Sequence, residues 1–482
     1  SIFVEVSPHP LLAYAVKDTL ANQPHRSIAT LQRDANDTVT FHTNLNAAHT
    51  VRPPKTPQRG GPRVQLPTTP WHHAHHWIHI AAQESLPHKR TDVAPAAGET
   101  HEWFHQLAWP VRELAPGDTD VRWLVLGDDD GLPALLGPGS QALPLSVLDD
   151  ADALRAALPG VQHVVYAPPT SPARFEAAPS YDAFRQLRRL VVALAGTTDA
   201  PKLFIVTRNA QPVTEGDRAN PAHAVLWGQG RTLALEHPEF WGGLIDVDET
   251  LPPELLALYL RTEASVVDVT NRDDQAVHRR DDQAVHRRDD QAVYRGGERR
   301  VPRLEACPLP AVSLTRLESG TSHLVIGATG NVGPYLIRQL AEMGASTIVA
   351  ASRRGGGQLT ELAEELAAGG TTLVEVVADA ADEASMAAVF ARFGADLPPL
   401  DGIYLASLAG GEALLADMTD DDVTPMFRSK IDAATVLHKL SLRTPVRRFV
   451  LFSSITGLLG SRAVAHYTAA NAFADAFAYA RR

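Results

Sequence analysis

One segment constrains the fold of this chain more than any other: residues 322–345, SHLVIGATGNVGPYLIRQLAEMGA. The apolar letters HLVI predict a buried strand, the glycines at 327, 330 and 333 predict a tight turn, and PYLIRQLAEMG predicts a helix that ends at Gly344. Glycines let a backbone bend sharply and approach a phosphate, and a helix N-terminus offers N–H groups and a positive dipole. The segment therefore predicts a parallel α/β sheet with a nucleotide site. Its G-x-x-G-x-x-G spacing differs from the G-x-G-x-x-G of many dinucleotide turns.

The next two predicted strands supply further candidate nucleotide contacts. The strand STIVAAS is followed by Arg353 and Arg354, at the place where the adenosine ribose of a dinucleotide would lie. Arginines there are suited to the 2′-phosphate of NADP, whereas an acidic residue would favour NAD. A solvated basic turn is the alternative interpretation. The third strand, in LVEVVADAAD, leads to Asp379, which we expect to meet an adenine edge.

Polar side chains near the end of the sequence predict proton transfer. A strand at 449–452 runs into Ser453 and Ser454, Tyr467 begins a helix, and Asn471 lies one helical turn later. Reduction of a ketone requires a proton donor and a group that polarises the carbonyl oxygen. A tyrosine hydroxyl can donate the proton, a serine hydroxyl can bind the same oxygen, and a nearby cation favours the phenolate.

The first half of the chain shows the same alternation without a phosphate-binding turn. Apolar segments at 122–127, 163–167, 202–207 and 241–248 alternate with helical stretches such as 180–196, which predicts a second parallel sheet. The first of these strands leads into GDDDGLP, whose three carboxylates would repel a phosphate. We therefore predict a Rossmann-like fold without a nucleotide site.

Charge and cysteine content exclude several functional classes. The chain has 482 residues, a net charge of −12 and one cysteine, Cys307. The acidic balance argues against nucleic-acid binding, and a single cysteine permits no intrachain disulfide, so we expect a cytoplasmic protein. We find no apolar run near the roughly 18 residues that suggest a membrane span.

Three segments lie outside the two predicted folds. Residues 53–70 have the proline, glycine and basic composition of a linker. Residues 71–79, WHHAHHWIH, hold five histidines; a metal site is one interpretation, but no Cys, Asp or Glu is near, so we favour packing and predict no metal. The sequence RDDQAVHR at 272–279 recurs at 280–287 and, as RDDQAVYR, at 288–295. An even period preserves strand facing, so we expect a tandem duplication that lengthens a hairpin or forms a loop.

The glycine turn and the serine–tyrosine pair resemble the short-chain dehydrogenase/reductase superfamily, and more specifically the ketoreductases of modular type I polyketide synthases. In that family an asparagine stands one turn after the tyrosine, as Asn471 does, and the lysine comes from an earlier helix, which Lys430 in MFRSKIDAATVLHKL matches. The resemblance implies catalytic roles for Tyr467, Ser454, Lys430 and Asn471, with protons relayed between Lys430 and Asn471. It also implies NADPH as cofactor, contacted by Gly327, Thr329, Gly330, Asn331, Val332, Gly333, Ser352, Arg353, Arg354, Asp379 and Ala406.

The resemblance extends over nearly the whole chain. Residues 223–248 resemble the family's structural subdomain, a truncated Rossmann fold without a nucleotide site; residues 3–12 resemble the end of an acyltransferase, and residues 66–78 the linker after it. The implied domains are an acyltransferase tail at 1–30, a linker at 31–100, a structural subdomain at 101–315 and a catalytic subdomain at 316–482. The acyltransferase motif G-H-S-x-G is absent, so we expect His9 to be structural. The sequence begins without Met and stops before the family's final strand and lid, so we expect a piece of a longer chain.

The resemblance also implies a reaction and partners. It implies reduction of a β-ketoacyl thioester, tethered by phosphopantetheine to an acyl carrier protein, in a homodimeric synthase that includes ketosynthase and acyltransferase domains. The domain order leaves no room for a dehydratase or an enoylreductase, which implies a β-hydroxyacyl product. The segments LAGGEALLADMTDDDVTPMF and GSRAVAHYTA resemble lipid-forming synthases of the phthiocerol type.

The sequence departs from the family at several positions. Residues 405–408 read LASL where the family has H-A-A-G, so Leu408 replaces a glycine near the cofactor. The L-D-D and tryptophan markers of hydroxyl configuration are both missing, which leaves the configuration open. A catalytically silent scaffold is therefore an alternative that Leu408 supports and that intact Lys430, Ser454 and Tyr467 oppose. A free-standing reductase of small carbonyls is disfavoured by the acyltransferase tail.

Overall fold

The computed structural model divides into two compact units, residues 1–92 and 93–482. The structure describes 2–51 except 8–9, 11, 13–14, 17–18, 21–25 and 32–36; 104–274 except 116, 118–120, 128–130, 173 and 215; and 289–482 except 308–315, 355–356 and 358. Several predicted features lie outside the described residues: His9, the linker at 53–70, the histidine segment at 71–79, the three carboxylates at 128–130 and most of the first two repeat copies. Expectations about them stay predictions.

The first unit is a small α/β element. Strands β1 (Ile2–Glu5) and β2 (Arg26–Ala29) pair in parallel, and helix α2 (Asp37–Val51) follows. The hydroxyl of Thr30 donates to the carbonyl oxygens of Glu5 and Ser7, both at 3.1 Å, and so ties the ends of the two strands together.

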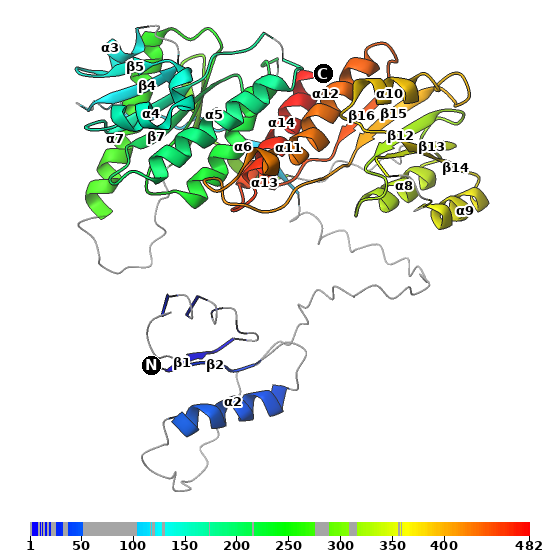
Figure 1. Ribbon diagram of the computed structural model, residues 1–482, viewed down its shortest axis with the longest axis horizontal. Coiled ribbons are helices and arrows are strands. Elements are labelled where there is room, and N and C mark those ends of the chain that lie inside the picture. The colour runs from blue at the N-terminus through cyan, green and yellow to red at the C-terminus, as the bar shows by residue number, and fades with distance from the viewer. Residues whose placement is uncertain are drawn as a thin grey trace. The chain divides into compact units, whose positions relative to one another are not determined.

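The second unit contains two sheets (Figure 1). The first has the order β10-β9-β8-β7-β6-β4-β5, parallel throughout except for the β9–β10 hairpin at its edge. The predicted parallel strands are confirmed. The first strand of the hairpin is the QAVYR of the third repeat copy, where the sequence predicted either a lengthened hairpin or a loop. The strands are β4 (Trp123–Gly127), β5 (Gln141–Leu143), β6 (His163–Ala167), β7 (Lys202–Arg208), β8 (Trp241–Val247), β9 (Gln291–Arg295) and β10 (Glu298–Arg300).

Both faces of the first sheet are covered because its strands are apolar on both sides. Trp123 and Val125 of β4 share a core with α3 and α7, whereas Leu124 and Leu126 share one with α4, α5 and α6, as the period of two residues in a strand requires. A separate antiparallel pair, β3 (His105–Ala108) with β11 (Arg303–Ala306), joins the two ends of this part. The helices are α3 (Leu132–Leu136), the 3₁₀ turn η2 (Leu145–Asp149), α4 (Ala151–Ala157), α5 (Ala178–Ala195), α6 (Pro221–Glu236) and α7 (Pro253–Asp274).

The second sheet has the order β14-β13-β12-β15-β16, and all its neighbouring strands are parallel. The chain reverses its direction of winding between β12 and β15, and ligands of open α/β sheets bind at such a point. Its strands are β12 (Ser322–Ile326), β13 (Thr347–Ser352), β14 (Thr372–Val377), β15 (Leu400–Leu405) and β16 (Arg448–Leu451). Its helices are α8 (Gly333–Glu342), α9 (Thr360–Ala368), α10 (Glu383–Phe390), α11 (Asp420–Phe427), the π turn η3 (Arg428–Asp432), α12 (Ala433–Ser441), α13 (Thr456–Leu459) and α14 (Ala465–Ala480).

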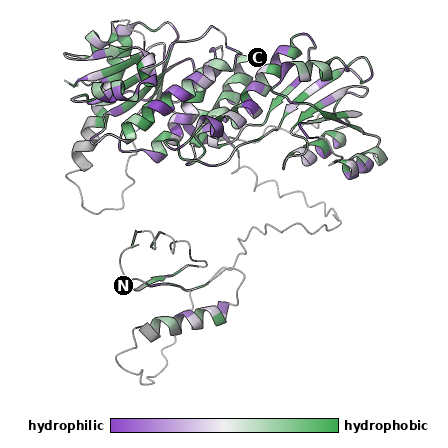
Figure 2. Ribbon diagram, in the orientation of Figure 1, coloured by the Kyte–Doolittle hydropathy of each residue, from purple (hydrophilic) through white to green (hydrophobic). Residues whose placement is uncertain are grey.

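Helices α6 and α14 pack against each other between the two sheets (Figure 1). A Cβ atom at Gly228 of α6 would lie 2.3 Å from the carbonyl oxygen of Thr468 of α14, so only glycine permits this approach. The Thr468 hydroxyl in turn donates to the Gly228 carbonyl at 2.9 Å. One hydrophobic core contains residues of both sheets, and the strands of both are predominantly hydrophobic in Figure 2. The two subdomains are therefore joined by shared packing.

Candidate active site

The glycine turn after β12 has the geometry that its sequence predicted. Gly327 has a φ of +82°, and a Cβ atom there would lie 2.7 Å from the Ser407 nitrogen. A Cβ atom at Gly333, the first residue of α8, would lie 2.2 Å from the Ala328 carbonyl oxygen. A Cβ atom at Gly330 would lie 3.2 Å from the Gly327 carbonyl oxygen, its nearest neighbour. Packing therefore requires glycine at 327 and 333, whereas a Cβ atom at Gly330 would make one tight contact, with a backbone oxygen beside the cavity.

A cavity of about 370 Å³ lies at the carboxyl ends of β12, β13 and β15. Nine of the predicted cofactor contacts line it: Gly327, Thr329, Gly330, Asn331, Val332, Ser352, Arg353, Asp379 and Ala406. Gly333 and Arg354 are not among the lining residues; Gly333 is buried in the start of α8, and the Arg354 carbonyl accepts a hydrogen bond from Ser352 at 2.7 Å. Ligand contacts at all of these positions stay predictions.

Charged side chains give one end of this cavity a polar character. Arg353 is exposed and lines the cavity, and Arg428 also lines it and pairs with Asp379 at 2.9 Å. Burial opposes ionisation of Asp379, but hydrogen bonds from Ala381 and Arg428 outweigh it and hold the pKa of this carboxyl below its usual range. The sequence reasoning missed Arg428, although it lies two residues before the candidate lysine.

Lys430 lies on the π turn η3 and is 7% exposed. Its Nζ donates to the Phe452 carbonyl at 2.7 Å and lies 5.5 Å from the centre of the Tyr467 ring. Burial lowers the pKa of Lys430 to about 8, although Asp475 opposes the shift. π turns interrupt helices frequently at functional sites. The structure thus brings Lys430 and Tyr467 together, as the predicted site requires.

Ser454 and Asn471 lie on segments adjoining this pair. The Ser454 hydroxyl oxygen, just after β16, accepts hydrogen bonds from the nitrogen and the hydroxyl of Thr456, at 3.3 and 3.1 Å. Asn471 is on α14, one turn after Tyr467, and is 0% exposed. Among the described residues neither atom of its amide has a hydrogen-bond partner. Buried polar groups are usually satisfied, so this amide has capacity for a water or a ligand.

Leu408, the residue that departs from the family pattern, lines the cavity but does not close it. Its side chain is 63% exposed. The neighbouring Ser407 hydroxyl donates to the Ser429 carbonyl at 2.6 Å, which anchors this loop beside Lys430.

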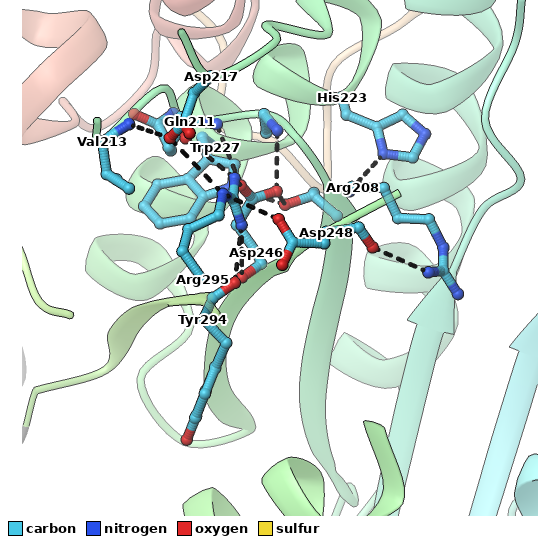
Figure 3. A network of polar contacts seen from close by, with 12 residues as sticks. Arg208, Gln211, Val213, Asp217, His223, Trp227, Asp246, Asp248, Tyr294 and Arg295 are labelled. Atoms are coloured by element: carbon cyan, nitrogen blue, oxygen red, sulfur yellow. Dashed lines mark hydrogen bonds and ion pairs between the residues drawn. The ribbon is translucent and has the colours of Figure 1, made fainter. Parts of the chain in front are cut away.

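In the first sheet, a polar network occupies the carboxyl ends of strands β7 and β8 (Figure 3). Asp246, at the end of β8, is 0% exposed and accepts hydrogen bonds from the Thr207 hydroxyl at 2.6 Å, the Ala210 nitrogen at 2.8 Å and Arg295 at 2.5 Å. Trp227 donates to the same Thr207 hydroxyl at 2.8 Å. These contacts fill the carboxyl ends of β7 and β8, whereas the winding of this sheet reverses between β4 and β6. The absence of a nucleotide site from this half stays a prediction.

The described residues also bear on metal binding and on membrane insertion. In the part of the chain that the structure describes, no three His, Cys, Asp or Glu side chains group closely enough to hold a metal ion. The helices of that same part include none with the length and hydrophobicity needed to cross a membrane.

Two family models match the chain. The model described as "KR domain" matches residues 321–482, and that described as "Polyketide synthase extender module SpnB, Rossmann fold domain" matches residues 107–280. The chain is a ketoreductase region of a modular polyketide synthase. The recognised family is therefore confirmed, and so is the class of activity, since ketoreductase domains are nucleotide-dependent oxidoreductases.

Curated relatives align with this ketoreductase region over its full length. A phenolphthiocerol/phthiocerol polyketide synthase from Mycobacterium bovis is 49% identical over 100% of this chain and 32% of that protein. Erythronolide synthase EryA3 of Saccharopolyspora erythraea is 30% identical over 100% of this chain and 15% of its own length. The chain therefore spans about a third or less of these relatives.

Solved structures confirm the fold. A-type ketoreductases from a modular polyketide synthase are 28% identical with a TM-score of 0.65, over 78% of this chain and 80% of the other. An A1-type ketoreductase is 29% identical with a TM-score of 0.65, over 78% and 79% of the two chains. The predicted pair of Rossmann-like subdomains is thus that of known ketoreductases.

Proposed function

We propose that this ketoreductase uses NADPH to reduce a β-ketoacyl thioester, carried by an acyl carrier protein, to the β-hydroxyacyl thioester. The observation that carries the proposal is the buried Lys430 ammonium beside the Tyr467 ring, close to a glycine-lined cavity that contains Arg353. A decayed site would be expected to lose at least one member of this set.

The cavity fits a dinucleotide phosphate. Gly327 and Gly330 leave the turn free of side chains, and the N-terminus of α8 follows, where backbone N–H groups favour a phosphate. Arg353 is suited to the 2′-phosphate that distinguishes NADPH, and Asp379 to an adenine edge. When bound, NADPH supplies the hydride for the β-carbon.

The chain's own residues supply the proton. The Tyr467 hydroxyl donates its proton to the substrate oxygen, which the Ser454 hydroxyl also binds. The Lys430 ammonium stabilises the resulting phenolate, because a nearby positive charge favours the ionised form of a phenol. The unpartnered amide of Asn471 is suited to hold a water that returns a proton toward Lys430.

The surrounding chain gives this reaction its setting. We assign residues 1–30 to an acyltransferase tail, 31–100 to a linker, 101–315 to the structural subdomain and 316–482 to the catalytic subdomain. The similarity to a phenolphthiocerol/phthiocerol polyketide synthase supports a role in lipid-forming chain extension. We expect a homodimeric synthase whose ketosynthase and acyltransferase domains share the chain.

A reduction assay tests the proposal against a silent scaffold. The protein is mixed with NADPH and a β-ketoacyl thioester, and oxidation is followed at the nicotinamide absorbance band. We expect oxidation by the wild type and none by Tyr467→Phe, with unchanged NADPH binding. Tyr335→Phe is the matched control, because Tyr335 is 73% exposed on α8 and lies outside the cavity lining. NADPH binding without oxidation by the wild type would favour the scaffold, and full activity of Tyr467→Phe would refute the assigned role.

A further inference from the structure

A carboxylate of the structural subdomain reaches two loops of the catalytic subdomain. Glu236 is the last residue of α6 and is half-buried. Its Oε1 accepts a hydrogen bond from the Ala463 nitrogen at 2.6 Å, and its Oε2 accepts one from the Leu415 nitrogen at 2.8 Å. Hydrogen bonds to an ionised acceptor are among the stronger ones in proteins. One side chain therefore fixes two backbone segments that are far apart in sequence.

Both segments adjoin the catalytic residues. Ala463 lies just before α14 and Tyr467, and its φ of +62° is uncommon for a residue with a side chain. Leu415 follows the loop that carries Leu408, a residue of the cavity wall. The segments also bond each other, since the Ala413 nitrogen donates to the Ala463 carbonyl at 2.8 Å. Glu236 thus holds together the two segments that border the site.

Other residues of α6 bind the same region before the tyrosine. The Thr232 hydroxyl donates to the Ser461 carbonyl at 3.0 Å, and Arg231 donates to the Gly457 carbonyl at 2.5 Å. Figure 1 shows α6 beside α13 and α14, in agreement with their contacts. The side of α6 that faces the catalytic subdomain is consequently a continuous support for residues 457–463.

The loop after β15 also meets the residue directly before the tyrosine. His466 is 1% exposed, and a Cβ atom at Gly410, which has a φ of +125°, would lie 3.2 Å from its Nε2. A displacement of this loop would therefore change the packing at the start of α14. The position of Tyr467 and the shape of the site entrance depend on the same packed contacts.

We propose that Glu236 is a positioning residue for the acyl substrate. By fixing the spacing between residues 408–415 and 457–463, it orients the β-keto group toward Tyr467 and selects the face that receives the hydride. This inference rests on the proposed β-ketoacyl reduction. It gives the structural subdomain, which has no predicted nucleotide site, a direct part in substrate selection.

Two substitutions at Glu236 separate this role from general stability. Glu236→Gln preserves the volume, but its amide has one acceptor oxygen and would turn N–H donors toward one of the two backbone nitrogens. Glu236→Ala removes both acceptors and leaves Ala463 in its unfavourable conformation without support. Glu254→Gln is the matched control, because Glu254 is exposed in the first turn of α7.

Kinetics and product analysis of these variants test the proposal. Loosening a site by about 1 Å can cost about a hundredfold in rate, so we expect kcat/KM for the thioester to fall by about tenfold to a hundredfold. The loss should be smaller in Glu236→Gln than in Glu236→Ala, and chiral chromatography should show both hydroxyl configurations where the wild type gives one. NADPH affinity should stay unchanged, and Glu254→Gln should match the wild type. Unchanged kcat/KM and configuration in Glu236→Gln, or an equal loss of NADPH affinity, would overturn the proposal.

Amide hydrogen exchange tests the anchor without turnover. We expect the Ala463 and Leu415 amides to exchange faster in Glu236→Gln than in the wild type, while amides of β12 stay protected. If the wild type oxidises no NADPH, the proposed function fails, and unchanged exchange at both amides would separately refute the anchor. If Glu236→Ala does not fold, Glu236→Gln alone decides both readouts.

Discussion

The buried ion pair of the first sheet gives a quantitative test of how that subdomain is held together. Asp246 is 0% exposed, Arg295 is 9% exposed, and their closest atoms are 2.5 Å apart (Figure 3). Arg295→Met removes the guanidinium and leaves a buried carboxylate without its cation. Breaking a buried pair in this way typically costs about 3–5 kcal/mol, because the remaining charge is uncompensated.

The hydrogen bonds that survive set the expected magnitude. Asp246 would still accept from the Thr207 hydroxyl and from the nitrogens of Ala210 and Gln211. We therefore expect the lower end of the range, about 3 kcal/mol, which corresponds to a decrease of roughly 6–12 °C in the melting temperature of a subdomain of this size. The double variant Asp246→Asn with Arg295→Met should recover part of that loss, because residue 246 then carries no charge, although Asp217 also loses its contact with Arg295 at 3.7 Å.

Thermal and urea unfolding, followed by circular dichroism, measure these differences. Arg155→Met is the matched control, because Arg155 pairs with Asp152 on an exposed helix surface and such pairs contribute about 1 kcal/mol or less. A loss below about 1 kcal/mol in Arg295→Met would refute the reasoning, since it is the size expected of an exposed pair. So would a double variant that is no more stable than the singles.

Four further predictions concern the catalytic subdomain. Reduction should slow as pH rises through about 8, the value to which burial lowers the pKa of Lys430, because the neutral amine no longer stabilises a phenolate; a rate profile flat up to pH 10.5 would contradict this. Between pH 8 and pH 10.5 the free energy of unfolding should rise with pH in the wild type but not in Lys430→Met. The reason is that Lys430 in the unfolded chain still holds a proton that the folded lysine has released. Gly333→Ala should lower the melting temperature, since its Cβ would lie 2.2 Å from the Ala328 carbonyl oxygen. Gly330→Ala, whose Cβ would lie 3.2 Å from the Gly327 carbonyl oxygen, should lower it less and weaken NADPH binding; equal melting temperatures of the two variants would contradict this. Arg353→Glu should weaken NADPH binding by roughly tenfold to a hundredfold and leave NADH binding unchanged, as calorimetry would show.

Local signals account for the parts of the fold that the sequence predicted well. The strand, turn and helix of residues 322–345 follow from glycine spacing and apolar runs, and the structure gives β12 and α8 at these places. For the repeat, the sequence analysis left a hairpin and a loop as alternatives, although Gly296 and Gly297, with φ of +58° and +88°, form a turn typical of hairpins between β9 and β10. The eight-residue repeat ends at Arg295, directly before this turn. In this part of the sequence the repeat is a more regular signal than the two glycines.

Long-range contacts account for the parts that the sequence did not predict. The pairing of Arg295 with Asp246 joins residues separated by 49 positions, and no local pattern indicates it. The bonds from Glu236 to Leu415 and Ala463 depend on how two subdomains pack. The π turn at Lys430 was likewise not indicated, because the segment reads as a continuous helix and the change of register depends on tertiary packing.

Transfer of deuterium from NADPH labelled at nicotinamide C4 tests the central claim most directly. The wild-type protein is incubated with each C4 epimer of the labelled cofactor and a β-ketoacyl thioester, and the product is analysed by mass spectrometry. We predict a β-hydroxyacyl thioester with deuterium on the β-carbon from one epimer, and no such product from Tyr467→Phe. Bound NADPH with no deuterium in the product from either epimer would contradict the account and favour a non-reducing scaffold.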